Sequence, residues 1–176
     1  MVRGKNMAFN GYFDIEAANA EFPMGWVPVN GDQGTRWEWS TEYPVLGQHT
    51  VKVRNTSYTR SMVGIVQDQC YAIPVRAGEA WELSAWMKTE QPGVPLRLIA
   101  VFMDDTLRYL SEYHLKFTST TQMQRYGGLV VIPPGVSRLK VACGVHDSPE
   151  TLPSVLWISW VSLRHIEDSS SGEDRK

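Results

Sequence analysis

The hydrophobic and polar residues of this chain alternate over short segments, and residues 79–88 show the pattern most clearly. Side chains of a β-strand point to its two faces in turn, so alternate apolar residues predict a strand with one buried face. The apolar face here carries Trp81, Leu83, Ala85 and Met87. Trp86 lies an odd number of positions from Trp81, which places it on the opposite face together with Glu82 and Lys88.

Segments of the same kind recur along the chain, with Gly- and Pro-containing turns between them. They are residues 7–15, 35–40, 49–55, 61–67, 70–75, 96–103, 126–132, 137–145 and 154–166. Residues 104–117 fit a helical spacing as well as alternation, and we favour a strand there because the neighbouring segments are strands. Residues 14–22 could form one or two turns of helix.

About ten short strands without a regular strand–helix alternation predict an all-β, antiparallel sandwich or barrel. Alternation within the segments favours two packed sheets, that is, a two-sheet antiparallel β-sandwich. We expect this sandwich to be one domain over residues 1–166, followed by a disordered polar tail over residues 167–176.

Two of the later segments indicate which side chains face outward. In residues 137–145, the apolar face contains Leu139, Val141 and Cys143, so Lys140 and, just beyond, His146 lie on the other face. In residues 154–166, regular alternation groups Val155, Trp157, Val161 and Leu163 on one face, and Leu156, Ile158 and Trp160 on the opposite one. This strand is therefore also predicted to carry an indole on each face.

Composition narrows the classes of partner. The formal net charge of the 176 residues is −2, which argues against a nucleic acid or an anionic membrane surface as partner. The chain has no apolar run long enough for a membrane span, and no signal peptide is visible. We expect a cytoplasmic protein or a part of a larger exported assembly, with Cys70 and Cys143 as buried free thiols.

The sequence contains no recognisable catalytic or metal-binding motif. Its four histidines lack the close spacing of zinc ligands, and there is no phosphate-binding loop or nucleophile elbow. Asp104, Asp105 and Glu112 could suggest the two carboxylates of a glycosidase, but adjacent acidic residues before Thr106 are more simply a turn. We expect no enzymatic activity, no metal and no cofactor.

Seven short motifs occur in an order that resembles a known group of proteins. They are NGYFD at 10–14, Gly25-Trp26, GQHTVKVRN at 47–55, Gln67-Asp68, AGEAWELSAWMK at 77–88, VIPPGVSRLKV at 131–141 and LWISWVSL at 156–163. Their order resembles the jelly-roll carbohydrate-binding modules of families four, nine and twenty-two, which are attached to xylanases and cellulases. The resemblance covers residues 8–165 and implies a galactose-binding-like jelly roll that binds an oligosaccharide or polysaccharide.

The resemblance also implies a structural calcium ion near Asp14, held in part by an aspartate of the closing strand. The two aspartates that this strand carries in the group are replaced here by Ser159 and Trp160. Calcium prefers several oxygen ligands that include carboxylates. We therefore do not expect the ion in this protein.

The outward-facing tryptophan suggests where a sugar would bind. Sugar rings present flat C–H patches edged by hydroxyl groups, and a flat indole flanked by polar side chains suits them. We predict such a platform at Trp86 and Glu82, next to the strand that offers Lys140 and His146. Trp37 and Trp39 share a face and either line the cleft or close the core at one end of the sandwich. Packing of Trp86 under a loop, or in a protein–protein interface, is the alternative.

Two classes of function follow from these patterns. The first is a non-catalytic carbohydrate-binding module that stacks aromatic side chains on sugar rings. The second is a structural or assembly subunit, of the virion or surface-layer type, in which the aromatic residues contact other proteins and a homo-oligomer forms. A glycan array and a measurement of the mass in solution distinguish the two.

Overall fold

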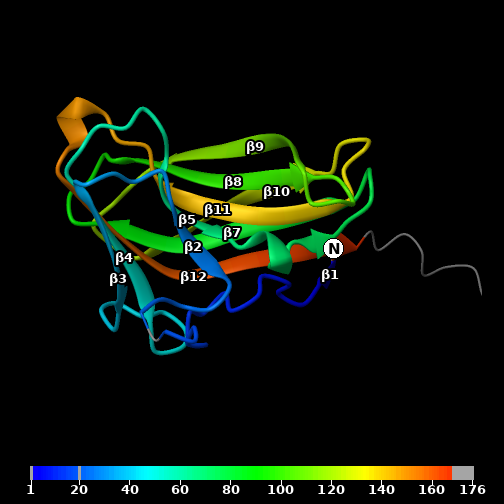
Figure 1. Ribbon diagram of the computed structural model, residues 1–176, viewed down its shortest axis with the longest axis horizontal. Helices are drawn as coiled ribbons and strands as arrows, with labels where there is room; N and C mark the ends of the chain where they lie inside the picture. The colour runs from blue at the N-terminus through cyan, green and yellow to red at the C-terminus, as the bar shows by residue number, and fades with distance from the viewer. Residues whose placement is uncertain (1, 20, 168–176) are drawn as a thin grey trace, which may run out of the picture.

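The computed structural model describes residues 2–19 and 21–167, which form two antiparallel sheets (Figure 1). Sheet I contains, in spatial order, β10 (Gln124–Val131), β7 (Ala80–Thr89), β12 (Ser154–Glu167), β4 (Thr50–Asn55) and β3 (Thr35–Ser40), with β1 (Val2–Arg3) beside the end of β12. Sheet II contains β2 (Trp26–Val29), β5 (Val63–Gln67), β11 (Arg138–Val145), β8 (Pro95–Met103) and β9 (Tyr109–Thr118), with β6 (Ile73–Pro74) beside β11.

The described ranges contain two short 3-10 helices, η1 (Gln69–Tyr71) and η2 (Pro149–Thr151), and no α-helix. The predicted two-sheet antiparallel jelly roll is confirmed. No helix among these residues has the length and apolar character needed to cross a membrane.

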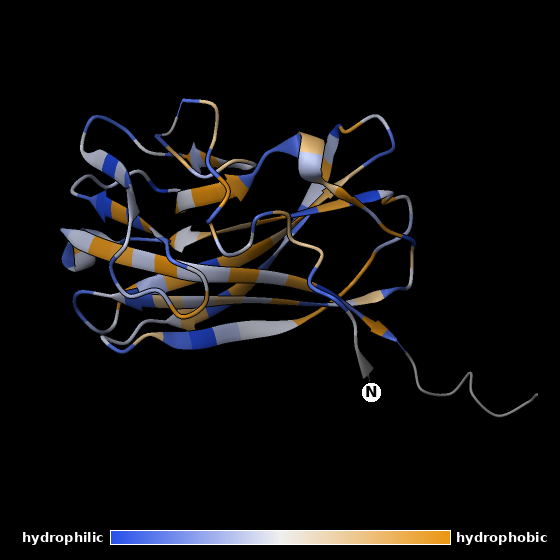
Figure 2. Cartoon of the chain, turned by 90° about the horizontal axis from the view of Figure 1, so that it is seen from below, coloured by the Kyte–Doolittle hydropathy of each residue, from blue (hydrophilic) through white to orange (hydrophobic). Residues whose placement is uncertain are grey.

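The hydrophobic core lies between the two sheets and is built by strand alternation. In Figure 2, hydrophobic and polar segments follow one another along many of the strands. From sheet I, Leu83, Ala85 and Met87 of β7 are fully buried in this core, and Trp81 is buried beside them. From sheet II, Leu139, Val141 and Cys143 of β11 meet them. The faces predicted for both strands are confirmed, because each strand runs through this region as one regular element.

Strand β12 departs from the prediction at a β-bulge. Its register against β7 shifts between Ile158 and Trp160, so Ser159 is the extra residue. A bulge adds one unpaired residue and exchanges the two faces beyond it. The core therefore receives Leu156 and Ile158 before the bulge, and Val161 and Leu163 after it. The prediction of an indole on each face of β12 is wrong: Trp157 and Trp160 lie on the same outer face, paired with Lys88 and Trp86 of β7.

Residues 7–15 form a loop and not the predicted strand. Asn10 and Phe13 have positive backbone φ angles of 46° and 61°, which a regular strand does not contain. The side chain of Asn10 holds the loop: its Nδ2 donates to the carbonyl groups of Ile15 and Met24, both at 2.9 Å, and its Oδ1 accepts from the Ile15 N–H at 3.0 Å. Local side-chain bonds of this kind compete with strand pairing. The alternating pattern here reflects a folded-back loop whose Phe13 side chain reaches the core.

The structure decides two predictions that the sequence left open, over residues 104–117 and 14–22. Residues 109–118 form β9, as favoured, and the described part of residues 14–22 contains no helix.

The predicted strand over 70–75 is reduced to η1 and the two-residue β6, which leaves Cys70 exposed, whereas Cys143 is buried. The prediction of two buried thiols is therefore wrong for Cys70. Strand β12 runs to Glu167, and the rest of the predicted tail, residues 168–176, lies outside the described residues.

Candidate functional site

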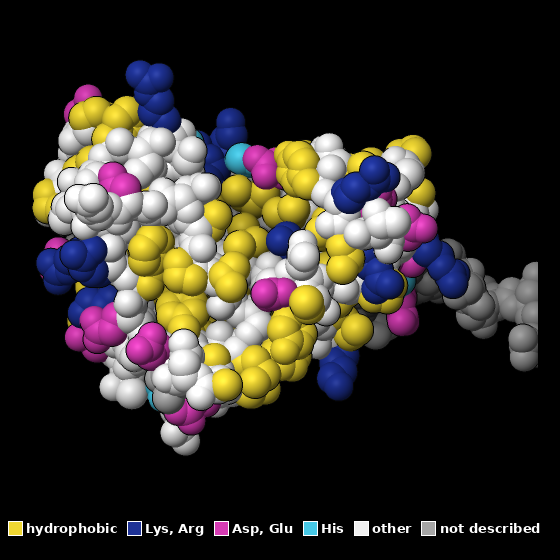
Figure 3. Space-filling view, in the orientation of Figure 1, with side chains coloured by type: hydrophobic (Ala, Val, Ile, Leu, Met, Phe, Trp, Pro, Cys, Tyr) yellow, Lys and Arg dark blue, Asp and Glu magenta, His cyan; other side chains and the backbone are white. Residues whose placement is uncertain are grey.

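A groove of about 430 Å³ lies on the outer face of sheet II. Its floor is apolar and is built by the outward side chains of three adjacent strands and one loop: Met62, Val66, Ile99, Val101 and Ala142. In Figure 3 this groove is lined by hydrophobic side chains, with charged side chains within it and along its edges. The volume falls within the range of ordinary ligand sites, roughly 300–1,000 Å³.

Strand register explains the apolar floor. Strand β8 is apolar on both faces, so its outward residues Ile99 and Val101 are hydrophobic although they do not belong to the main core. Ala142 of β11 pairs with Ile99 on one side and with Val66 of β5 on the other. Its small side chain leaves depth between larger neighbours. The nearly continuous apolar run of residues 96–103 thus supplies both the core and the groove.

Polar and aromatic residues border this floor. From β9, Glu112 pairs with Val101 and His114 with Ile99 across the sheet. The Glu112 carboxylate and the His114 Nε2 lie 2.7 Å apart. Tyr109, at the start of β9, lines the groove and is 60% exposed, so its ring is available as a flat surface at the rim. The other rim residues from the loops include Asn30 and Arg60.

Lys140 and His146 are the two predicted site residues that line the groove. Burial lowers the pKa of Lys140, and the carboxylate of Asp68 opposes that shift. Burial also lowers the pKa of His146, and the nearby Arg97 acts in the same direction. Within the described residues neither side chain has a hydrogen bond or an ion pair. Lys140 and His146 are thus partly buried polar side chains that form no hydrogen bond or ion pair with a described residue.

Glu82 and Trp86 lie on the outer face of sheet I, on the opposite side of the sandwich from Lys140 and His146. The prediction that these four residues share one surface is therefore wrong. Alternation along one strand fixes its two faces, but it does not decide which sheet that strand joins. The roles of Glu82 and Trp86 in ligand binding stay predictions.

The outer face of sheet I is occupied by aromatic contacts. Trp86 is half-buried beside Trp160, whose ring stacks on Tyr12 with the centroids 5.6 Å apart. The indole Nε1 atoms of Trp86 and Trp160 are buried and have no hydrogen-bond partner within the described residues. Glu82 is buried too, and its Oε1 lies 2.7 Å from the Arg125 guanidinium.

The loop over residues 41–48 covers part of this face. The ring centroid of Tyr43 lies 5.2 Å from that of Trp157, and the Lys88 Nζ lies 3.8 Å from the Tyr43 centroid. The Val45 N–H donates to the Ser159 Oγ at 2.6 Å, so the bulge of β12 anchors the loop. Trp86 therefore lies on a surface where side chains already contact one another.

Trp37 and Trp39 of β3 are half-buried, and each indole donates a hydrogen bond to the backbone of another segment. The Trp37 Nε1 donates to the Gly64 carbonyl at 2.8 Å, and the Trp39 Nε1 donates to the Phe13 carbonyl at 2.7 Å. Trp37 packs against the core, whereas Trp39 lies beside the His49 ring, with the ring centroids 4.4 Å apart. Trp37 also lines a hollow of about 740 Å³ near the edge strands β2 and β3.

That hollow is larger than the groove, yet its charged side chains Asp68 and Arg36 already have partners. Asp68 accepts from the Cys70 N–H at 2.9 Å, and Arg36 donates to the carbonyl groups of Gln33 and Thr35 at 2.9 and 2.8 Å. A ligand site needs polar groups that are free to bind. The groove on sheet II satisfies this condition better, and we take it as the candidate site.

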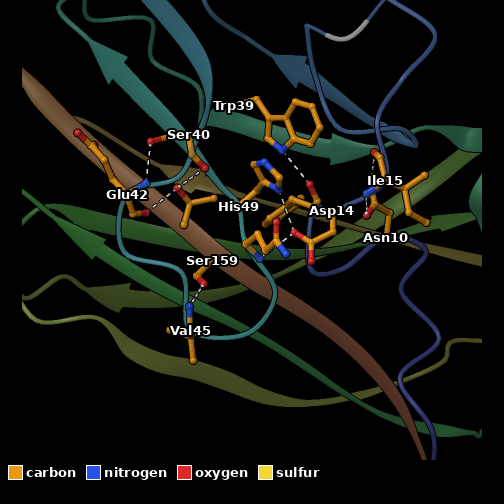
Figure 4. A network of polar contacts seen from close by, with 12 residues as sticks. Asn10, Asp14, Ile15, Trp39, Ser40, Glu42, Val45, His49 and Ser159 are labelled. Atoms are coloured by element: carbon orange, nitrogen blue, oxygen red, sulfur yellow. Dashed lines mark hydrogen bonds and ion pairs between the residues drawn. The ribbon is translucent and has the colours of Figure 1, made fainter.

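The residues around Asp14 do not fit a calcium ion. Its Oδ1 accepts from the Gln48 N–H at 2.9 Å and lies 3.0 Å from the His49 Nδ1 (Figure 4). On its other side, Gly47 packs so closely that a Cβ there would lie 2.5 Å from the Asp14 Oδ2. Ser159 already accepts the Val45 N–H. Within the described residues, no group of three His, Cys, Asp or Glu side chains is placed to hold a metal.

Asp104 has a structural role. Its carboxylate accepts the backbone N–H of Arg108, the Thr106 hydroxyl and the Arg108 guanidinium, and these bonds hold its pKa at about 2. It thereby fixes the turn between β8 and β9, as the sequence indicated. Glu112, the other acidic residue considered, faces His114 in the groove.

Sequence reasoning missed Tyr109, Glu112 and His114 as groove residues. Residues 104–117 fit an alternating pattern, but alternation does not say whether Tyr109 or Tyr113 faces outward. A register shift between Phe102 and Met103 decides this by placing Tyr109 opposite Met103. No signal in the sequence marks that irregularity.

Comparison with known proteins supports this fold. No protein-family model matches the sequence, and no curated protein matches it. Among solved structures, a xylan-binding domain of Paenibacillus barcinonensis Xyn10C (family CBM22) is similar over 96% of this chain and 99% of its own, with a TM-score of 0.64 at 14% identity. TmCBM61, solved with β-1,4-galactotriose, is similar over 93% and 100%, with a TM-score of 0.60 at 15% identity.

A domain of bacteriophage CBA120 tailspike protein 4 is also similar, with a TM-score of 0.69 at 15% identity over 92% of this chain. The chain spans 21% of that tailspike structure. At such identities a likeness establishes the fold. The protein therefore has the jelly-roll fold of carbohydrate-binding modules, and the resemblance read from its sequence is confirmed at that level.

Proposed function

We propose that this protein is a non-catalytic carbohydrate-binding module that binds an oligosaccharide or polysaccharide chain in the groove of sheet II. One observation carries the proposal: an open groove with an apolar floor, an exposed tyrosine at its rim, and polar side chains without partners within the described residues. A sugar ring matches these features, because its C–H faces suit the floor and Tyr109 while its hydroxyl groups suit Lys140 and His146.

The similar structures support this proposal, since one is a xylan-binding domain and another was solved with a galactotriose. The absence of catalysis is supported by the commitment of the Asp104 carboxylate to a turn. Without a second free carboxylate opposite Glu112 among the described groove residues, the usual pair for glycoside hydrolysis is not assembled.

The test is a glycan array followed by retardation in polysaccharide gels, with Tyr109→Ala as the variant. We expect Tyr109→Ala to weaken binding about tenfold or more, because one aromatic platform can dominate a shallow site. Tyr113→Ala is a matched control: it is on the same strand and 50% exposed, but it pairs with Ala100 and does not line the groove. Equal retention of binding by both variants would contradict the proposal, as would release of reducing ends by the wild type.

A structural or assembly subunit is the second candidate function. The specific observation is the edge strand β10, whose outward residues Leu129 and Val131 are 53% and 62% exposed. Unpaired edge strands with apolar side chains are places where a second chain can add. A mass in solution above that of one chain, reduced by Val131→Lys, would favour this candidate.

A further inference from the structure

The charges of the groove indicate more than a general affinity for sugars. Among its lining residues, the side chains with a permanent charge are Arg60, Lys140 and Glu112. His114 and His146 add two basic groups. The one carboxylate among them, that of Glu112, is already held by His114 at 2.7 Å. Basic groups therefore dominate the surface that a ligand would meet.

Lys140 lies where the structure gives it no counter-charge in contact. Across the sheet it pairs with Val101, and Val101 pairs with Glu112, so two strand spacings separate the lysine from that carboxylate. The two backbones are therefore about 9.5 Å apart, and no ion pair joins the two side chains within the described residues, where the Glu112 carboxylate lies 2.7 Å from the His114 Nε2 instead. The other nearby carboxylate, Asp68, attracts Lys140 but accepts the Cys70 N–H at 2.9 Å.

The setting of the ammonium group is unfavourable for a charge on its own. Lys140 is half-buried between the apolar floor residues Val101 and Ala142, and no described residue forms an ion pair with it. Partly buried charges are usually paired, because the loss of water is otherwise uncompensated. An anionic group of the ligand would supply the missing partner and would gain a charge-assisted hydrogen bond.

We propose that the groove recognises an acidic glycan, and that Lys140 binds a carboxylate of a uronic-acid residue in it. The inference rests on the proposed function, because it names the class of sugar for the same groove. Arg60 and His146 lie in the same lining and would add to the attraction without needing direct contact. The overall charge of −2 does not oppose this, since a local basic surface determines the field that a bound group meets.

The experiment compares one polysaccharide in two forms. A uronic-acid-containing polymer is used as isolated and after chemical reduction of its carboxyl groups to neutral alcohols, and affinity is measured by gel retardation and calorimetry. We expect the wild type to bind the acidic form about 10- to 100-fold more tightly, and this difference to shrink as salt is added. Lys140→Met should lose most of this preference, while Lys140→Arg should keep it.

Lys116→Met is the matched control, because it removes the same charge from the same face of sheet II, outside the groove lining. It should keep the preference for the acidic form. An equal loss in Lys116→Met and Lys140→Met would overturn the assignment to Lys140. Equal binding of both polymer forms by the wild type would overturn the acidic class but leave the sugar-binding function standing. Binding of neither form, nor of any glycan on the array, would refute both. Circular dichroism verifies that each variant is folded.

Discussion

The outer faces of both sheets carry aromatic and basic side chains, but one tyrosine and one lysine of sheet II lack, within the described residues, the ring contacts and ion pairs that such side chains form on sheet I. On sheet I, Trp86, Trp157 and Trp160 contact other side chains, and the cations Lys52 and Arg125 have carboxylate partners at 2.9 and 2.7 Å. On sheet II, the floor is aliphatic, one tyrosine stands exposed at the rim, and Lys140 has no ion pair within the described residues.

This difference shows that residue type alone does not mark a binding surface. A tryptophan on an outer face attracts attention in a sequence, yet on sheet I the loop over residues 41–48 already packs onto that face. The groove of sheet II contains no tryptophan. Unpaired polar groups beside an open apolar surface distinguish it, and these depend on contacts between strands that are far apart in the sequence.

The largest expected effect concerns the two indoles of β7. Trp81→Ala should lower the free energy of unfolding by about 3–5 kcal/mol, because it empties a large site in the core. Trp86→Ala should cost about 1–3 kcal/mol, since the half-buried ring leaves a cavity open to solvent. Urea denaturation measures both losses, and if the sugar binds in the groove of sheet II, as we propose, neither variant should change binding once folded. If folded Trp86→Ala loses binding, the ligand site lies on sheet I and our comparison of the faces is wrong.

Removal of one basic side chain should change the free energy of unfolding differently on the outer faces of sheet I and sheet II. Arg125→Met breaks its bond to the buried Glu82 and should destabilise the protein by about 1.5–3 kcal/mol. Lys140→Met removes a half-buried ammonium whose pKa is lowered by burial, so the free energy of unfolding should stay the same or rise slightly. Matched urea melts at neutral pH test the pair. A loss in Lys140→Met as large as that in Arg125→Met would mean that the lysine has a stabilising partner.

The smallest effect concerns the dependence of stability on pH. Burial and Arg97 lower the pKa of His146, so the unfolded chain binds a proton more readily than the folded one. Stability from this residue is complete above the unfolded pKa of about 6.5 and declines as the pH falls towards the folded value. His146→Gln should therefore lose less stability than the wild type between pH 7.5 and pH 5. Identical pH dependence of the two proteins would show that His146 is not desolvated in the groove.

Much of the fold could be predicted from the sequence, because alternation is a local signal. It located most of the strands and the two faces of β7 and β11. It failed in β12, where Ser159 is inserted as a bulge that no residue type announces. It failed also over residues 7–15, where the side chain of Asn10 bonds to the backbone of a folded-back loop.

The candidate site was predicted only in part. Lys140 and His146 were placed correctly on an outward face, since their strand alternates without interruption. Their neighbours could not be found, because the groove joins β5, β8, β9 and β11, whose spatial order is not the order of the sequence. The residues that complete it, Tyr109, Glu112 and His114, come from a strand that pairs with β8 through a register shift.

The hydrogen bonds of Asp14 bear on how the stability of its loop depends on the ions in solution. A bound ion stabilises a protein in proportion to the logarithm of its free concentration, so a fold closed by calcium weakens where calcium is scarce. Here the loop is closed by the chain itself, through the Gln48 N–H, the His49 ring and the tight packing of Gly47. The part of the loop's stability that these contacts provide therefore does not vary with the concentration of free calcium.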